Sequence, residues 1–578
     1  AAWYISRAAM AAQLKVNMRD HEPLLLSHLV DRGCVLQPNN LIVTKTANGY
    51  HIVTYSQHLQ RAKRLASALS KWGVKLEDRI GTLMWNSAWH YECYHAIPCM
   101  GAVLHTLNLR LGPADLGYII EHAADRIIIS DADKLELLGQ LDQRIMSNVE
   151  LLVCVGEGGA PGKWQLPPGV QTQQVLDYEE FLSSGDAEYV WPQFPETTTM
   201  GLCYTSGTTG KPKGVAYSHR STFLHTLMMC GGDQLCLHGY DVVLPFVPMF
   251  HVLSWGAPFA MLLTGARAIF TSRFMDPASL VQLMIDWKVD LSMGVPTVWQ
   301  GVRNYIEQQG LEEIRKNLTL KRLTCGGSAP QPELMRWFLD KLGVEFLQGW
   351  GMTETNPMGS FGIRVAKYAD KEKSVEESFK NVLKAGLPLP GVRVRIANPD
   401  NMDVDQPQGQ PGELLVKGPW IIQEYFQTDA PDKFHQGWLI TGDVAKLDEE
   451  GAIVISDRSK DVVKSGGEWI SSIDMENLIM AMEEIDLAAV VGVPHPRWDE
   501  RPIAVVILAK GRADNNLLER VRQHLSSAFA KFQLPDDVLV WKEIPMTTTG
   551  KIDKKTIRAK LKEQSYTLPS ERGPASKL

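Results

Sequence analysis

The chain has 578 residues, of which 44% are hydrophobic and 22% charged, and its formal net charge at pH 7 is −7. This length exceeds what one hydrophobic core supports and predicts roughly two to four domains. The composition is typical of a soluble globular enzyme, and the negative charge balance argues against a general nucleic-acid-binding protein.

Cysteine usage and hydrophobic patterning narrow the class further. The eight cysteines include no Cys-x-x-Cys pair, which argues against a zinc site or a disulfide framework and favours reduced thiols in an intracellular compartment. No apolar run reaches the about 18 residues that a membrane span needs. Residues 1–20 are interpreted as a flexible leader, because their start has one basic residue and no long apolar core, unlike a signal peptide.

Short apolar runs alternate with helical patterns over the first 440 residues. Residues 56–73 predict an amphipathic helix that stops at Gly73. The runs that predict strands are 79–85, 126–131, 151–156 and 290–299. This alternation predicts an α/β architecture with mixed or largely parallel sheets.

The pattern changes toward the carboxyl end. Residues 412–456 are β-rich, and DEEG at 448–451 predicts a hairpin turn. The polar stretch 456–461 predicts a boundary, after which residues up to about 562 carry their own strand and helix patterns. These residues suffice for a small α+β domain.

A loop rich in glycine, threonine and lysine follows the apolar run GLCY (201–204). Glycines let backbone N–H groups turn toward an anion, while hydroxyls add donors and lysines add charge. The loop therefore predicts a phosphate-binding site rather than a flexible linker. It is not a Walker A loop, because only two residues separate Gly207 from Gly210 and Pro212 follows Lys211.

The stretch YTSGTTGKPKGV (204–215) is similar to the signature loop of the adenylate-forming superfamily, which includes acyl-CoA synthetases, luciferases and peptide-synthetase adenylation domains. Other segments resemble further family motifs in family order: GWGMTE (349–354), TGD (441–443), residues 457–477 and PMTTTGKIDKK (545–555). The resemblance covers roughly residues 20–562. It implies an N-terminal AMP-binding domain over 21–456, a hinge at 457–459, a mobile C-terminal domain over 460–562 and a tail over 563–578.

The resemblance also implies a two-step reaction. A carboxylate attacks the α-phosphate of ATP to give an acyl-adenylate and pyrophosphate, and the thiol of coenzyme A then displaces AMP. Thr353 would donate to the α-phosphate, and Lys551 would stabilise the charge that develops there. Glu354 and Thr205 would share Mg²⁺, which prefers oxygen ligands. Taken alone, Lys551 could belong to a basic surface segment, but its TTTGK context favours catalysis.

Further residues are expected to bind the nucleotide. Asp443 would accept hydrogen bonds from the ribose hydroxyls, with Arg458 beside it; a structural aspartate capping a turn is the alternative. The full set expected to bind ATP is Thr205, Ser206, Gly207, Thr208, Thr209, Gly210, Lys211, Pro212, Lys213, Gly327, Ser328, Ala329, Pro330, Gln348, Gly349, Trp350, Gly351, Met352, Thr353, Asp443 and Arg458.

The resemblance also implies sites for the acid and for coenzyme A. The expected acyl-pocket lining is His251, Val252, Trp255, Gly256, Val295, Trp299 and Gly327, and the expected coenzyme A contacts are Lys464, Ser465, Gly466, Gly467 and Trp469. By its apolar neighbours alone His251 would be a core residue, whereas the resemblance gives it a catalytic place near the carboxylate. Trp255 resembles an aromatic gate, with a core tryptophan as the alternative.

The apolar lining contains no arginine or lysine and favours an aliphatic or thioether acid over a dicarboxylate. The whole chain most resembles medium- and long-chain fatty-acid CoA ligases and methylmercaptopropionate ligases, although Leu253-Ser254 stands where relatives often carry Asn-Ala. A short-chain acid ligase, a luciferase-like oxygenase, a carrier-loading adenylase and an inactive adenylate-binding scaffold stay open as alternatives. A homodimer is implied at the family level alone.

The chain ends in Ser576, Lys577 and Leu578. This SKL tripeptide is a peroxisomal address that an import receptor reads, and it is not a membrane anchor. We therefore expect a peroxisomal protein if the host is eukaryotic and a cytoplasmic one otherwise.

Overall fold

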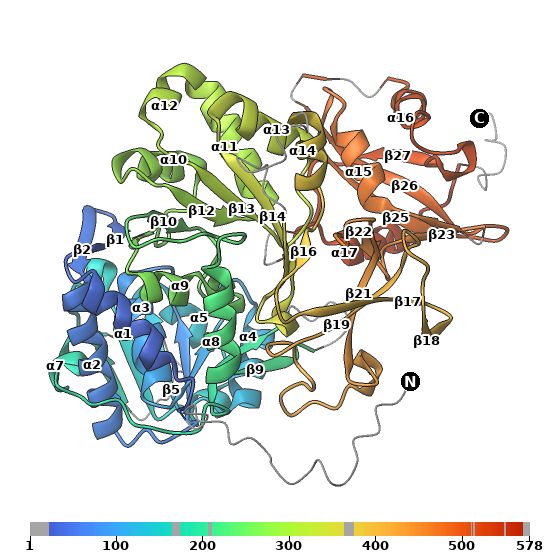
Figure 1. Cartoon of the computed structure of the whole chain (residues 1–578). Coiled ribbons are helices and arrows are strands. Elements are labelled where there is room, and N and C mark those ends of the chain that lie inside the picture. Colours follow the sequence, from blue (N-terminus) through green and yellow to red (C-terminus); the bar gives the residue numbers. More distant parts are fainter. Residues whose placement is uncertain are drawn as a thin grey trace, which may run out of the picture.

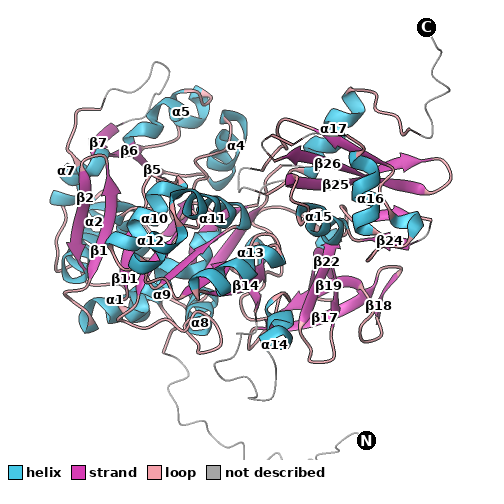
Figure 2. Cartoon of the chain, turned by 90° about the horizontal axis from the view of Figure 1, so that it is seen from above, coloured by secondary structure: helices cyan, strands magenta, loops and turns pink. Residues whose placement is uncertain are grey.

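A computed structural model describes residues 22–164, 174–205, 211–362, 375–466, 468–509, 511–512, 515–547 and 551–569. The large N-terminal part contains two α/β layers, and a smaller unit, coloured orange to red, lies against it (Figure 1). The same division is visible from above (Figure 2). The predicted α/β class with a small α+β C-terminal domain is confirmed.

The first sheet has the strand order β7-β6-β5-β3-β4-β8-β9. Its strands pair in parallel except for β8 with β9. The bounds are β3 Arg79–Leu83, β4 Val103–Thr106, β5 Ile127–Asp131, β6 Leu151–Val155, β7 Gln174–Asp177, β8 Thr199–Tyr204 and β9 Gly214–Ser218. Helices that precede, follow or connect these strands include α2 Tyr55–Lys71, α3 Ala88–Cys99, α4 Pro113–Ala123, α7 Tyr178–Ser183 and α8 His219–Met229.

The second sheet has the order β16-β15-β14-β13-β12-β10-β11-β1-β2. The strands from β14 to β1 pair in parallel. The bounds are β1 Leu41–Thr46, β2 Gly49–Thr54, β10 Val242–Pro245, β11 Arg267–Phe270, β12 Leu291–Gly294, β13 Arg322–Cys325, β14 Glu345–Gly351, β15 Met358–Phe361 and β16 Leu387–Pro388. Its helices are α1 Leu26–Leu36, α9 Ala257–Thr264, α10 Pro277–Asp286, α11 Pro296–Gln309, α12 Leu311–Asn317, α13 Pro332–Trp337 and α14 Val375–Val382.

The third sheet is antiparallel and links the large part to the small domain. Its strands are β17 Arg393–Asn398, β18 Asn401–Asp405, β19 Gly412–Lys417, β20 Phe434–His435, β21 Trp438–Leu447 and β22 Ile453–Arg458. The small domain contains β23 Val463–Ser465, β24 Glu468–Ile470, β25 Ile485–His495, β26 Asp499–Leu508, β27 Asp537–Val540, α15 Ser472–Met480, α16 Leu517–Leu525 and α17 Lys554–Glu563.

The largest hydrophobic cluster joins the first two sheets. It combines Leu104 of β4, Tyr91 and Tyr94 of α3, Phe259 of α9 and Phe270 of β11, all of which are fully buried. Because this core fixes the two sheets relative to each other, the loops at their strand ends are held in a defined arrangement.

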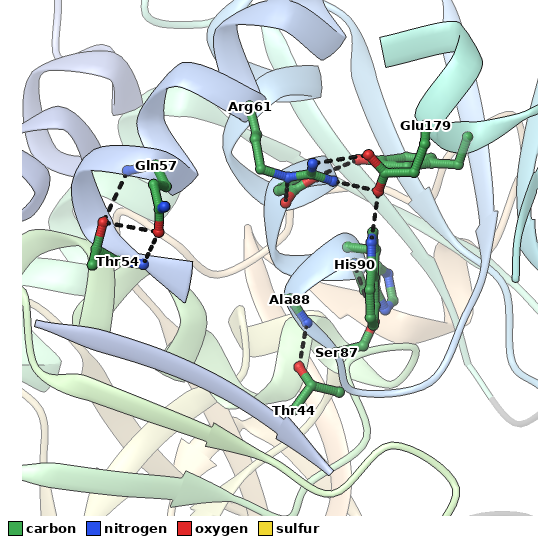
Figure 3. Close-up of polar contacts among 11 residues, drawn as sticks. Thr44, Thr54, Gln57, Arg61, Ser87, Ala88, His90 and Glu179 are labelled. Carbon is green, nitrogen blue, oxygen red and sulfur yellow. Dashed lines mark hydrogen bonds and ion pairs between the residues drawn. The ribbon is translucent and has the colours of Figure 1, made fainter. Parts of the chain in front are cut away.

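Local signals explain the start of α2 and its attachment. Thr54 and Gln57 form a capping box, in which the Gln57 side chain accepts from the Thr54 N–H at 2.8 Å (Figure 3). Further along α2, Arg61 pairs with Glu92 at 2.6 Å and with Glu179 at 2.7 Å. Arg61 thus ties α2 to α3 and α7.

The expected elements agree with the structure, with one correction. The helix predicted at 56–73 is α2, the strands predicted at 79–85, 126–131 and 151–156 are β3, β5 and β6, and 448–451 turns between β21 and β22. The strand predicted at 290–299 was too long. It ends at Gly294, and α11 begins at Pro296, because proline is favoured at the first position of a helix.

Two further features concern the whole chain. All eight cysteines are free thiols, six of them buried and two, Cys230 and Cys236, half-buried. In the part of the chain that the structure describes, none of the helices combines the length and apolar character needed to cross a lipid bilayer.

Candidate active site

The candidate site forms where parallel strands end. β10 ends shortly before His251, β12 ends just before Val295, β13 leads into Gly326–Pro330 and β14 leads to Thr353. Because the carboxyl ends of parallel strands share one edge of a sheet, these loops converge there, which is where ligands bind in open α/β sheets.

Lys551 of the small domain reaches into this edge. A Cβ atom added to Gly327 would lie 3.3 Å from Lys551 Cε, 4.0 Å from its Nζ and 3.4 Å from Val295 Cγ1, and Gly327 has a φ of +85°. The 326–330 turn therefore leaves the space that the lysine fills. Burial and the nearby Arg458 guanidinium lower the pKa of Lys551 to about 8, against the attraction of Asp443 and Glu354.

Asp443 is held on both carboxylate oxygens. Its Oδ1 pairs with Arg458 Nε at 2.7 Å, and its Oδ2 accepts from Trp350 Nε1 at 2.8 Å. Asp443 and Arg458 face each other as partners across β21 and β22. A carboxylate has further lone pairs beyond these two contacts. The structure therefore brings Trp350, Asp443, Arg458 and Lys551 together, as the resemblance implies, while the ribose role of Asp443 stays a prediction.

Glu354 is a buried carboxylate next to the loop base. Tyr425 donates its hydroxyl to Glu354 Oε1 at 2.7 Å, and Tyr217 donates to the Thr353 carbonyl at 2.7 Å. Burial raises the pKa of Glu354, while the Tyr425 hydrogen bond opposes that shift. Lys213 Nζ lies 4.9 Å from the centre of the Tyr425 ring. The tyrosines at 217 and 425 were missed from the sequence, because no local signal links them to Thr353 or Glu354.

The glycine-rich loop is closed at its base. Thr205 N–H donates to the Lys213 carbonyl at 2.9 Å, and Lys213 N–H donates to Thr205 Oγ1 at 3.2 Å. Lys211 Nζ lies 4.6 Å from the centre of the Tyr118 ring on α4, and Pro212 is buried. The predicted phosphate contacts Ser206, Gly207, Thr208, Thr209 and Gly210 lie outside the described residues.

A left-handed turn follows His251. Val252, Leu253, Ser254 and Trp255 have φ between +46° and +55°, and Gly256 has +77°. The Ser254 hydroxyl donates to the Val247 carbonyl at 2.7 Å. This backbone aims Trp255 at the 326–330 turn, where a Cβ on Gly326 would lie 3.0 Å from the Trp255 ring.

His251 faces positive charge. Burial lowers its pKa to about 3, and both Lys551 and Arg110 add to that shift. The imidazole is therefore neutral at physiological pH.

The expected adenine-side residues lie in β14 and in the turn that follows β13. Gln348 is buried in the middle of β14, and Ser328, Ala329 and Pro330 follow Gly327 in the turn after β13. A side chain is excluded at Gly351, where an added Cβ would lie 1.8 Å from the Pro357 carbonyl oxygen; at Gly349 an added Cβ would lie 2.4 Å from Met358 Cε, the end of a flexible side chain. Met352 is half-buried beside them.

The remaining expected site residues are Trp299 and the segment expected to bind coenzyme A. Trp299 is fully buried on α11 and packs on Phe338, in a different cluster from Val252 and Trp255. The segment expected to bind coenzyme A is in β23 and β24, on the far side of the small domain from β14 (Figures 1 and 2). Lys464 is exposed, Ser465 accepts from Arg501 at 3.0 Å, Gly466 packs under Trp498 and Trp469 is half-buried, whereas Gly467 lies outside the described residues.

Comparisons with known proteins agree with this geometry. The AMP-binding enzyme family matches residues 30–426, and its C-terminal domain matches residues 474–551. The chain therefore belongs to the AMP-binding enzyme family. Within that family its relatives are named as CoA ligases, and the chain is an AMP-forming acid–thiol ligase.

Two relatives are similar along nearly their whole length. The 3-methylmercaptopropionyl-CoA ligase of Ruegeria lacuscaerulensis is 39% identical over 94% of this chain and 98% of that protein. The long-chain-fatty-acid–CoA ligase of Thermus thermophilus is 40% identical over 94% of this chain and 96% of that protein. The anthranilate CoA ligase AuaEII with anthranoyl-AMP has the same fold, with a TM-score of 0.81 at 21% identity over 95% of this chain and 99% of that chain.

Proposed function

We propose that this enzyme activates a medium- to long-chain fatty acid, or a related apolar acid, with MgATP and transfers the acyl group to coenzyme A. AMP and pyrophosphate are released. The observation that carries the proposal is the position of Lys551, which extends from the small domain to the turn at Gly327 and lies among Asp443, Arg458 and Glu354.

The first half-reaction crowds negative charge. The substrate carboxylate attacks the α-phosphorus, a P–O bond forms, and the bond to pyrophosphate breaks with the electron pair leaving on pyrophosphate. The Lys551 ammonium offsets the charge that develops, and Thr353 donates a hydrogen bond there. His251, neutral at the operating pH, can donate or accept a hydrogen bond near the carboxylate without adding charge.

The residues present fit a magnesium ion. Glu354 is a buried carboxylate with one oxygen not engaged by Tyr425, and Thr205 supplies a hydroxyl at the loop base, so both are hard oxygen donors. These two side chains would hold the ion, which when bound would neutralise phosphate charge.

The second half-reaction needs the other face of the small domain. The sulfur of coenzyme A, after its proton has passed to water, forms a bond to the acyl carbon, the bond from that carbon to the AMP oxygen breaks, and AMP leaves with the electron pair. Lys464, Ser465, Gly466, Gly467 and Trp469 are proposed to meet coenzyme A after the domain turns about residues 457–459. In the present arrangement β23 and β24 lie far from β14, whereas Lys551 is in the candidate site. This supports an arrangement of the domains suited to adenylate formation.

The acid class rests on chemistry and on relatives. The wall formed by Val252, Trp255 and Val295 is apolar, and each methylene buried against it contributes about 0.8 kcal/mol. The names of the relatives favour two candidates, a fatty acid and 3-methylmercaptopropionate. The second of these, a thioether acid, is a candidate because the relative named for it matches nearly the whole of this chain.

A carboxylate panel tests the proposal. Pyrophosphate release at saturating MgATP is measured with straight-chain acids from C3 to C18 and with 3-methylmercaptopropionate, with and without coenzyme A. We expect acid-dependent release that coenzyme A accelerates. Release that coenzyme A fails to accelerate would favour a carrier-loading adenylase or a luciferase-like enzyme, and absence of release with every acid would favour an inactive scaffold.

We also propose that in a eukaryotic host the tripeptide 576–578 directs the chain to peroxisomes through the import receptor. The support is the tripeptide itself and the peroxisomal trans-cinnamate:CoA ligase of Petunia hybrida, 30% identical over 87% of this chain and 89% of that protein. The tripeptide lies outside the described residues. A fluorescent fusion that stays cytosolic with SKL intact would contradict the proposal. Homodimer formation is likewise a proposal, tested by analytical ultracentrifugation.

A further inference from the structure

Neighbouring residues of β22 serve different domains. Asp457 and Arg458 are consecutive in a strand, so their side chains point to opposite faces. Arg458 faces the candidate site and pairs with Asp443 at 2.7 Å. Asp457 points the other way, toward the small domain, and is 1% exposed.

Asp457 begins a buried series of polar contacts. Its Oδ2 accepts from the Ser472 N–H at 2.6 Å and from the Ser472 hydroxyl at 2.5 Å, at the first turn of α15. Lys554 Nζ donates to the same hydroxyl oxygen at 2.5 Å and pairs with Glu476 Oε1 at 2.7 Å. We call Asp457, Ser472, Lys554 and Glu476 the interdomain polar chain.

The members of the interdomain polar chain are buried. Ser472 is 0% exposed, Glu476 6% and Lys554 9%. The Val490 N–H adds a hydrogen bond to Glu476 Oε1 at 2.7 Å. Lys554 is buried, whereas the next residue, Lys555, is exposed. Burial of a charged lysine costs free energy unless its ammonium group is paired. The Ser472 hydroxyl and the Glu476 carboxylate are the partners that offset this cost for Lys554.

The polar chain is joined directly to catalytic positions. Lys554 lies three residues after Lys551, and Asp457 immediately precedes Arg458. The same two short segments therefore meet twice. On one side Lys551 and Arg458 share the candidate site, and on the other Lys554 and Asp457 share the Ser472 hydroxyl.

We propose that Asp457 and Lys554 are positioning residues for Lys551. Through Ser472 they hold the small domain in the orientation that keeps Lys551 in the site, and they favour adenylate formation over thioester formation. This inference rests on the proposed function. A polar link suits a reversible contact, because its charged groups regain hydration when the domain turns, unlike an apolar surface.

The first test uses Asp457→Asn, which keeps the shape of the side chain and leaves the Lys554–Glu476 pair intact. Adenylate formation is followed by acid-dependent ATP–pyrophosphate exchange, and thioester formation by supplying acyl-adenylate and coenzyme A. We expect exchange to fall about 10- to 100-fold, because one partner of a buried charged contact is weakened. Thioester formation should change less than about twofold.

Matched controls separate positioning from folding. Asp474→Asn removes the same charge from the exposed start of α15, and Lys555→Met removes a neighbouring exposed ammonium; both should leave the exchange rate unchanged. Ser472→Ala removes the shared hydroxyl with little change in volume and should repeat the effect of Asp457→Asn. Equal losses in both half-reactions with a lowered melting temperature would mean a structural role and overturn the proposal.

A double substitution and a physical readout complete the test. Asp457→Asn with Ser472→Ala should lose no more exchange than the larger single loss within about twofold, because both break one contact. Trypsin cleavage after the exposed Lys460 should also be faster in Asp457→Asn than in wild type. Absence of acid-dependent ATP–pyrophosphate exchange in the wild-type enzyme would contradict the proposed function but not this inference. If Asp457→Asn changed neither the rate of tryptic cleavage nor the rate of ATP–pyrophosphate exchange, this inference would be wrong while the proposed function would stand.

Discussion

At the scale of single residues, Lys551 combines two opposed effects. It must be charged to offset developing phosphate charge, yet the two domains that enclose it and the guanidinium of Arg458 destabilise that charge. Asp443 and Glu354 supply the attraction that keeps the ammonium form populated near neutral pH.

Lys551→Ala should nearly abolish adenylate formation and spare thioester formation. The loss of one preorganised cation is expected to cost about 10²–10³ in rate. Single-turnover assays with ATP and acid, and separately with acyl-adenylate and coenzyme A, measure the two halves. Equal losses in both would contradict the two-orientation mechanism.

The pH profile should report the same lysine. Because the pKa of Lys551 is lowered to about 8 and the protonated form is needed, kcat/KM for ATP should fall as the pH rises through about 8. No acidic limb near pH 6 is expected from His251, whose pKa is lowered to about 3. Lys551→Arg should retain activity at higher pH, and a wild-type profile that stays flat to pH 9.5 would refute the assignment.

Trp255 should act on the acid rather than on ATP. Its ring packs at the turn formed by Gly326, next to Val252. Trp255→Ala opens that wall, so the preferred chain length should shift by several carbons while KM for ATP changes little. The kcat/KM ratios across C6 to C16 acids measure this, and a defect confined to ATP would contradict the pocket assignment.

At the scale of elements, the left-handed turn Val252–Gly256 is the unusual feature. The left-handed conformation costs a residue other than glycine about 1–2 kcal/mol, and four such residues adopt it here. Packing of Leu253 and Trp255 and the Ser254–Val247 hydrogen bond over-determine the turn.

Gly256→Ala should destabilise this element. Gly256 has a φ of +77°, and an added Cβ would lie 2.9 Å from His225 Cε1. We expect a loss of about 1–3 kcal/mol in the free energy of unfolding of the large part, measured by urea denaturation. Gly232→Ala is the matched control, because nothing lies within 4 Å of its added Cβ. A similar loss in both variants would argue against strain at Gly256.

This turn also marks the limit of what sequence patterns predict. Buried parallel strands such as β5 and β6 were predictable from apolar runs, and α2 from its period and the Gly73 stop. The resemblance of the motifs to those of the adenylate-forming superfamily pointed to Lys551, Glu354 and Asp443. The turn was not predictable, because Val, Leu, Ser and Trp carry no signal for positive φ. The contacts of Tyr425 and Lys554 depend on chain segments far apart in sequence.

At the scale of the whole molecule, the candidate site is shared between two bodies. The third sheet carries Asp443 and Arg458, the loops of the second sheet carry His251 and Gly327, and the small domain carries Lys551. A ligand that fills this site therefore contacts both bodies and stabilises their present arrangement.

A non-reactive acyl-adenylate mimic should stabilise the molecule more than ATP alone. At 100 times its Kd a ligand adds about 2.7 kcal/mol to the stability of the state it binds. We expect a higher melting temperature and slower trypsin cleavage after Lys460. Stabilisation by the mimic without slower cleavage would show that it does not protect the segment around Lys460 between the two domains.

The distribution of thiols offers a practical route to watching the small domain turn. Six cysteines are buried, and the half-buried Cys230 and Cys236 both lie in the large part. Replacing those two by serine would leave a background nearly silent to maleimide dyes. One engineered cysteine on each body would then accept a donor–acceptor pair, so energy transfer could time each swing during turnover.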